Sequence, residues 1–297
     1  MRIIANPTQG RRVVRVLADA FARGNGLLAE KSDLVENQVP DGASPGSAEH
    51  ATFLFFVVCH DHGVRSRDLY RRAKVAYSER PWLFSAPDVI ERFAGPDDAG
   101  LVEATVSNIG VRYPREGARR WYLNALRLLL EYDGRADRLF RSTSDATDLL
   151  KKICSFRGYG PKTGGMLLRA AVGLGLAQVD RQQEVLVPVD IHDARIASYT
   201  GILTTSPAPA DEAAFRAYVP LVQRALRDSC REARVSWLDV DRALWLIGSR
   251  GCVLRRCSEC PLLDLCSVGS RQRAIDGVEM PRLAADPAAS LPRAGGQ

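Results

Sequence analysis

Apolar residues recur at helical spacing along most of the chain. This recurrence predicts helices over residues 11–24, 48–60, 66–77, 86–94, 116–134, 145–156, 191–202, 211–228 and 237–248. Several of these segments follow a Ser or Asp that can cap a helix. The alternation of apolar and polar residues that marks a half-buried strand is sustained nowhere. The pattern therefore predicts an all-α fold.

The composition narrows the class of protein only a little. With 297 residues and 46% hydrophobic residues, the chain can bury a sizeable core. A net charge of +6 fits an acidic partner, but it also fits an ordinary basic surface. No apolar run reaches the roughly 18 residues of a membrane helix, and the N-terminus lacks the apolar core of a secretory signal. We therefore expect a cytoplasmic protein with no membrane partner.

A glycine-rich turn lies between two predicted helices in the sequence CSFRGYGPKTGGMLL. One helix ends near Phe156, the turn contains Gly158, Tyr159 and Gly160, and the next helix begins at Pro161. Glycines let a phosphate approach bare N–H groups, and the positive end of the second helix favours the same anion. The pattern predicts a helix-hairpin-helix that contacts a nucleic-acid backbone through residues 158–160. A purely structural turn is the alternative.

Lys162 follows this turn in a chain that rarely uses lysine. Lysine occurs only at positions 31, 74, 151, 152 and 162, among 41 basic residues. In the first turn of a helix the macrodipole disfavours positive charge, which favours the unprotonated amine that a nucleophile requires. Lys162 is therefore a candidate nucleophile, and a lysine that only contacts phosphate is the alternative.

Asp190 follows the extended sequence VLVPV and precedes a predicted helix. An aspartate there can cap the helix, and Asp193 can complete a capping box. An amine that attacks a sugar carbon also needs a carboxylate nearby to accept its proton and to stabilise positive charge. Asp190 is the candidate for that second role.

Four of the seven cysteines are close together near the C-terminus, at Cys252, Cys257, Cys260 and Cys266. In a reducing compartment such a group predicts a metal site rather than disulfides. The spacing C-x4-C-x2-C-x5-C favours one [4Fe–4S] cluster held by a single loop over zinc.

The hairpin lysine, the VPVD aspartate and the four-cysteine loop, in this order, resemble the helix-hairpin-helix DNA glycosylase superfamily. The similarity is to the endonuclease III branch over residues 50–266. Lys162 falls on the catalytic lysine of that family and Asp190 on its catalytic aspartate. His60, in VVCHDHGVRSRDL, falls on the residue that fills the gap left by an extruded base, although the family usually has an amide side chain there.

The resemblance implies two helical domains that flank a DNA-binding cleft. Residues 1–45 would form an N-terminal helix and a flexible linker that pack with the C-terminal domain. Residues 46–172 would form a helical domain that ends in the hairpin, and residues 173–270 a second domain with the aspartate and the cluster. Residues 271–297 would be a disordered tail.

The function implied by the resemblance is that of a bifunctional DNA glycosylase and AP lyase of base excision repair. It would remove an oxidised base, 8-oxoguanine or an oxidised pyrimidine, through a lysine Schiff base and would nick the strand by β-elimination. The partner would be double-stranded DNA that contains a damaged base. The protein would be a monomer, associated with the nucleoid in a bacterium, with a [4Fe–4S] cluster and a monovalent cation at the hairpin.

Two departures from the endonuclease III pattern leave the loop geometry of the cluster and the substrate open. The gap between the first two cysteines is shorter, and an insertion, GLAQVDRQQEVL, precedes Asp190 and looks more like the 8-oxoguanine branches. Asp61, His62 and the insertion are candidates for the base pocket. The alternatives to a bifunctional enzyme are a monofunctional glycosylase, a non-catalytic DNA-binding module with an iron–sulfur cluster, and a structural protein that contains zinc.

Overall fold

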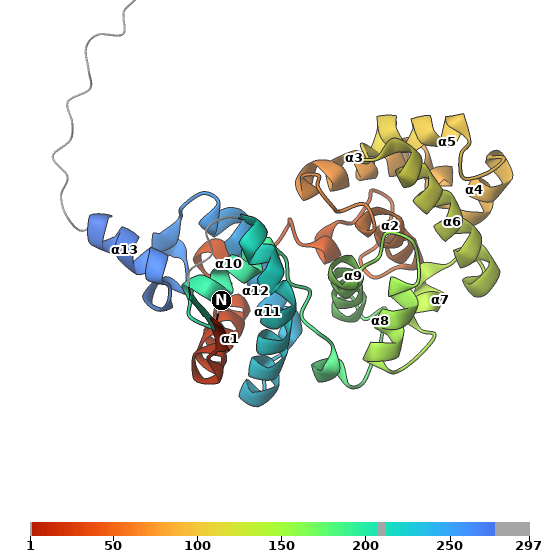
Figure 1. The fold of residues 1–297 in the computed structure, drawn as a ribbon. Helices are drawn as coiled ribbons and strands as arrows, with labels where there is room; N and C mark the ends of the chain where they lie inside the picture. The colour runs from red at the N-terminus through yellow and green to blue at the C-terminus, as the bar shows by residue number, and fades with distance from the viewer. Residues whose placement is uncertain (1, 207–211, 277–297) are drawn as a thin grey trace, which may run out of the picture.

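The computed structural model describes residues 2–206 and 212–276, and helices dominate it (Figure 1). The all-α prediction is confirmed. The α-helices are α1 (Pro7–Arg23), α2 (Ala48–Val58), α3 (Ser66–Glu79), α4 (Ala86–Arg92), α5 (Ala99–Ala104), α6 (Pro114–Tyr132), α7 (Ala136–Phe140), α8 (Ala146–Cys154), α9 (Pro161–Gly173), α10 (Ile191–Tyr199), α11 (Glu212–Ala233), α12 (Trp237–Leu246) and α13 (Ser267–Asp276).

The helices are arranged in two lobes (Figure 1). We call α2–α9 the middle lobe and α1 with α10–α13 the terminal lobe. Helix α1 packs on α11 and α12, so the first helix of the chain lies among the last ones. Helix α9 packs on α2 and α8 and also contacts the short 3-10 helix η2 (Val35–Asn37). In the sequence, η2 lies between α1 of the terminal lobe and α2 of the middle lobe.

Helix α2 forms the centre of the middle lobe, as its sequence ATFLFFVV predicts. The residues from Phe53 to Val58 are all buried, because this part of the helix has no polar side chain on any face. The ring of Phe56 stacks on that of Trp121 from α6, with 5.0 Å between the ring centroids. A helix that is apolar all round in this way positions the elements packed on it, and α9 is one of them.

A buried network of ion pairs joins α9 of the middle lobe to η2 and to α12 of the terminal lobe. Arg169 of α9 pairs with Glu36 of η2 at 3.1 Å and also with Asp241 of α12. Arg242 of α12 pairs with Glu36 as well. Removing one partner from such a network leaves an uncompensated buried charge, which typically costs about 3–5 kcal/mol. The network therefore fixes α9 relative to the terminal lobe.

The structure differs from the sequence prediction at a few short elements. Strands β1 (Arg2–Ala5) and β2 (Leu203–Ser206) form a two-stranded antiparallel sheet, with Ile3 opposite Thr205. Four residues are too few to display a sustained alternation, so the sequence did not reveal them. The predicted disordered tail began at residue 271, but α13 continues to Asp276, and residues 277–297 lie outside the described residues.

Within the described part of the chain, no helix is both long and apolar enough to span a membrane.

Candidate active site

The predicted helix-hairpin-helix is formed by α8, the turn at residues 155–160 and α9. Gly158 has a φ of +82°, and a Cβ atom there would lie 2.9 Å from the carbonyl oxygen of Cys59. The hydroxyl of Tyr159 donates a hydrogen bond to the carbonyl of Phe55 in α2. The turn is therefore anchored on the end of α2 by one bare backbone position and one buried tyrosine.

The two turn glycines differ in what they tolerate, which gives a matched pair of variants. Gly158→Ala is expected to lose at least about 1–2 kcal/mol of stability, because alanine is strained at positive φ and its Cβ would clash with backbone. Gly160 has a φ of −101° and open space where a Cβ would be, so Gly160→Ala should change stability little. Urea unfolding of both variants would check this, and equal losses would contradict it.

The start of α9 is held by Thr163. Its Oγ1 accepts the N–H of Gly160 at 3.1 Å and its hydroxyl donates to the carbonyl of Gly158 at the same distance. The first N–H groups of a helix have no partner within that helix, and they carry its positive end. Because Gly160 and Pro161 are exposed, this end is accessible to an anion from solvent.

Lys162 and Asp190, the two predicted catalytic residues, lie together. Lys162 Nζ is 3.6 Å from Asp190 Oδ2, although 28 positions separate them in the sequence. The side chain of Lys162 is 38% exposed and that of Asp190 is 16% exposed. The side chain of Lys162 is therefore partly accessible to solvent, and that of Asp190 is more buried.

Asp190 is the N-cap of α10, and the predicted capping box is present. Asp190 Oδ1 accepts the N–H groups of His192 at 2.7 Å and of Asp193 at 3.2 Å. In return, Asp193 Oδ2 accepts the N–H of Asp190 at 2.8 Å. The cap uses Oδ1 and leaves Oδ2 for Lys162.

The surroundings of Asp190 keep it ionised. Burial by itself would raise the pKa of this carboxyl, but the charge of Lys162, the electrostatic influence of His192 and the two N–H donors outweigh it. The net effect holds the pKa of Asp190 below its ordinary value. At neutral pH the site therefore presents a carboxylate to the amine of Lys162.

A second carboxyl group, Asp61, lies near this pair in the loop after α2. It is buried, and it accepts hydrogen bonds from Ser66 Oγ at 2.7 Å and from the hydroxyl of Tyr70 at 3.4 Å. Burial raises its pKa, and the charges of Lys162 and Asp190 both act on it. The sequence offered Asp61 only as one of several pocket candidates, and no sequence signal separated it from His62.

His60 and Tyr159, both predicted to contact DNA, have buried side chains. His60 is 4% exposed, and its ring stacks on that of Trp121 with 5.4 Å between the centroids. Burial and the charge of Arg120 lower its pKa to about 3, so the ring is neutral. With this placement His60 belongs to the core of the middle lobe, and filling a gap in DNA would require it to leave Trp121. Any DNA contact of Tyr159 would be through its backbone.

The four clustered cysteines line one cavity of about 280 Å³. The N–H of Gly269 donates to Cys266 Sγ at 3.4 Å, and no cysteine in the described residues forms a disulfide. Burial and the neighbouring thiols raise the pKa of Cys252 to about 11. Among the described residues, no three Cys, His, Asp or Glu side chains form a group that could hold a metal ion as they stand.

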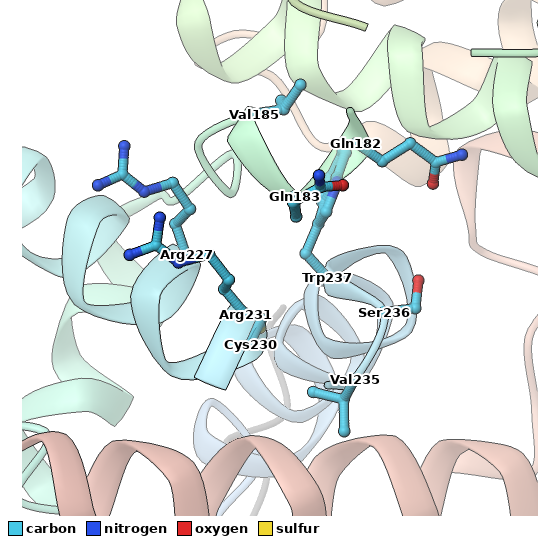
Figure 2. Close-up of a pocket in the computed structure, with 9 residues that line it drawn as sticks. All are labelled: Gln182, Gln183, Val185, Arg227, Cys230, Arg231, Val235, Ser236 and Trp237. Atoms are coloured by element: carbon cyan, nitrogen blue, oxygen red, sulfur yellow. The ribbon is translucent and has the colours of Figure 1, made fainter. Parts of the chain in front are cut away.

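A separate cavity of about 180 Å³ lies between the turn η5 (Gln182–Glu184), the end of α11 and the start of α12 (Figure 2). In this view the guanidinium groups of Arg227 and Arg231 point away from the indole of Trp237. Gln182, Gln183 and Val185 belong to the insertion that the sequence offered as a candidate for the base pocket, whereas none of the predicted catalytic, DNA-binding or metal residues lines this cavity. The lining residues are Gln182, Gln183, Val185, Arg227, Cys230, Arg231, Val235, Ser236 and Trp237.

Comparison with solved structures identifies the fold. The chain is similar to an endonuclease III trapped as a covalent intermediate with DNA, with a TM-score of 0.56 and 16% identity, over 91% of this chain and 100% of that one. It is also similar to a thermostable thymine-DNA glycosylase, with a TM-score of 0.54 and 14% identity, over 89% and 98%. Both proteins belong to the helix-hairpin-helix DNA glycosylase superfamily, so the resemblance inferred from the sequence is confirmed as a shared fold.

No model of a protein family matches the chain, and no curated protein matches it.

Proposed function

We propose that the protein is a DNA glycosylase with AP lyase activity that acts on an oxidised base in double-stranded DNA. The observation that carries the proposal is the pair formed by Lys162 and Asp190, 3.6 Å apart at the starts of two helices. The hairpin before Lys162 offers a phosphate the positive end of α9. An exposed amine beside an ionised carboxylate at such an anion site suits attack on a nucleotide.

The reaction begins with extrusion of the damaged nucleotide from the duplex, which costs a few kcal/mol and least for a damaged or mispaired base. Lys162 Nζ then attacks C1′ of the sugar with its lone pair, and the bond from C1′ to the base breaks. The base leaves with that bonding pair and takes up a proton. Loss of the amine proton and opening of the sugar give a Schiff base, and β-elimination then breaks the strand 3′ to the lesion.

Asp190 has two roles in this scheme. Its Oδ2 lies where it can accept a proton from Lys162, and its negative charge stabilises the positive charge that develops on the sugar ring. The lowered pKa of Asp190 suits the second role, because the group is already an ionised carboxylate when the reaction begins. A monovalent cation at the hairpin would be held by backbone carbonyl oxygens of residues 155–160 and would supply positive charge for a phosphate.

The choice of lysine supports the lyase half of the proposal. Arginine dominates the basic residues of this chain and would hold a phosphate at least as well. A guanidinium stays protonated, however, and cannot become a nucleophile. A covalent mechanism therefore requires lysine at position 162, whereas phosphate binding alone does not require it.

A panel of duplexes, each with a single lesion, tests the function. Base release and strand nicking are measured separately for each duplex in a single turnover. We expect release with nicking on a duplex that contains 8-oxoguanine or an oxidised pyrimidine. Release without nicking would make the protein a monofunctional glycosylase, and binding without release on every duplex would make it a non-catalytic module.

We further propose that Cys252, Cys257, Cys260 and Cys266 hold a [4Fe–4S] cluster. Each iron of such a cube carries its own thiolate, so the four sulfurs stay further apart than those around one zinc ion. The four thiols line one cavity of about 280 Å³, which leaves room for such a cube. The cluster would brace the loop that carries Arg255 and Arg256, and the proposed reaction needs no redox step from it.

Metal analysis of anaerobically purified protein checks the cluster. We expect a brown protein with about four irons and four inorganic sulfides per chain. Cys257→Ser should lose most of this iron, whereas Cys230→Ser, which changes a buried cysteine of α11 outside the cavity, should keep it. A colourless protein with stoichiometric zinc would contradict the proposal.

A further inference from the structure

Asp193 lies in the first turn of α10, directly behind Asp190, and is 4% exposed. Its Oδ2 accepts the N–H of Asp190 at 2.8 Å. Its other oxygen, Oδ1, is fully buried and has no hydrogen-bond partner. An ionised carboxylate with a buried, unpartnered oxygen is far more costly than a neutral acid in the same place.

The charged groups around Asp193 come from several elements. Asp190 on its own helix and Asp241 on α12 both oppose its ionisation, and Lys162 on α9 favours it. Lys162 and Arg169, however, are already paired with Asp190 and Asp241. Cys252 also lies within electrostatic range, but no hydrogen bond joins it to Asp193. Burial, followed by these two carboxyl groups, raises the pKa of Asp193 well above its ordinary value.

In α9, the position that corresponds to Asp193 of α10 is occupied by a neutral residue, Thr163. Thr163 is the third residue of α9, as Asp193 is of α10, and its Oγ1 accepts the N–H of Gly160 just as Asp193 Oδ2 accepts that of Asp190. The helix start that carries Lys162 is thus closed without a charge. A hydrogen-bond acceptor at this position is sufficient for the cap, and a negative charge is not needed.

We propose that Asp193 is a neutral carboxylic acid that acts as a positioning residue for Asp190. It fixes the backbone of Asp190 at the start of α10 and adds no charge, so that Asp190 carries the negative charge that faces Lys162. A second negative charge here would stabilise the ammonium form of Lys162 and reduce the fraction of free amine. The positioning role of Asp193 in the reaction rests on the proposed function, whereas its protonation state does not.

Variants of Asp193 separate the role of its hydrogen-bond acceptor from the role of a negative charge. Asp193→Asn and Asp193→Thr keep a neutral acceptor, and we expect their single-turnover base release to stay within about threefold of the wild type with an unchanged pH profile. Asp193→Ala removes the acceptor and should be slower at every pH. If either neutral variant shifts the pH profile, Asp193 is ionised in the wild type and the proposal is wrong.

A measurement without substrate tests the protonation state directly. The infrared difference between wild type and Asp193→Asn, or Asp193→Thr if the first variant does not fold, should contain the carbonyl stretch of a protonated carboxylic acid at neutral pH. Asp148→Asn, an exposed aspartate of α8, is the control and should lose a carboxylate band. Loss of a carboxylate band at Asp193 would overturn the proposal even if no DNA lesion is ever cleaved, so the two failures can be told apart.

Discussion

Replacing Lys162 with glutamine is expected to abolish both base release and the covalent product with DNA. Glutamine is similar in length to lysine, but its amide nitrogen has no lone pair available for attack, so the Schiff base cannot form. Loss of the nucleophile in other covalent enzymes costs up to about 10⁶-fold in rate. Borohydride reduces a Schiff base to a stable amine, so trapping on a lesion-bearing duplex, followed by gel electrophoresis, measures the loss.

Lys162→Arg is the sharper control for this result. Arginine keeps the positive charge beside Asp190 and can hold a phosphate in two hydrogen bonds, yet it stays protonated. We expect this variant to bind DNA as tightly as the wild type and to form no crosslink. If Lys162→Arg is as active as the wild type, Lys162 only contacts phosphate and the covalent mechanism is wrong.

Replacing Asp190 with asparagine is expected to lower the rate of base release by about 10²–10⁴-fold while DNA binding is retained. Asparagine is as good an N-cap as aspartate, so the start of α10 should hold and stability should change little. What disappears is the negative charge 3.6 Å from Lys162 Nζ. Single-turnover base release and a binding titration on the same duplex separate the two effects.

Asp190→Ala shows whether the cap matters in its own right. It loses the charge and also the oxygen that accepts the N–H groups of His192 and Asp193. We expect a further loss of about 1 kcal/mol in stability relative to the asparagine variant. If Asp190→Asn releases base at the wild-type rate, Asp190 is a cap only and the assignment of the site fails.

The parts of this molecule that the sequence predicted are those with a local cause. Each long helix has its own apolar spacing, and the hairpin has glycines followed by a proline, so both could be recognised from neighbouring residues. Lys162 and Asp190 were candidates from their residue type and local context, and the resemblance pointed to the same two residues, but only the fold brings them together. The capping box was local as well, since Asp190 and Asp193 are three residues apart.

What the sequence did not reveal depends on contacts between distant segments. His60 was expected to match the residue that fills the gap left by an extruded base, and the structure places its ring against Trp121, 61 positions away in the sequence. Asp61 was one of several pocket candidates, and the fold buries it near Lys162 and Asp190. Asp241 looks like an ordinary polar residue until the fold buries it and pairs it with Arg169. A buried charged residue can be recognised only when the fold shows its partner on another helix.

The ion network behind α9 has a consequence for how the proposed substrate would be held. Helix α9 carries Lys162 in its first turn, and Arg169, two turns later, ties the same helix to Glu36 and Asp241. A hinge between the lobes would have to break these buried pairs. Under the proposed function, a protein that cannot bend in this way would bend the double helix instead. Lesions that weaken base stacking make the duplex easier to bend. Such lesions would then be recognised by the flexibility of the duplex before any base enters a pocket.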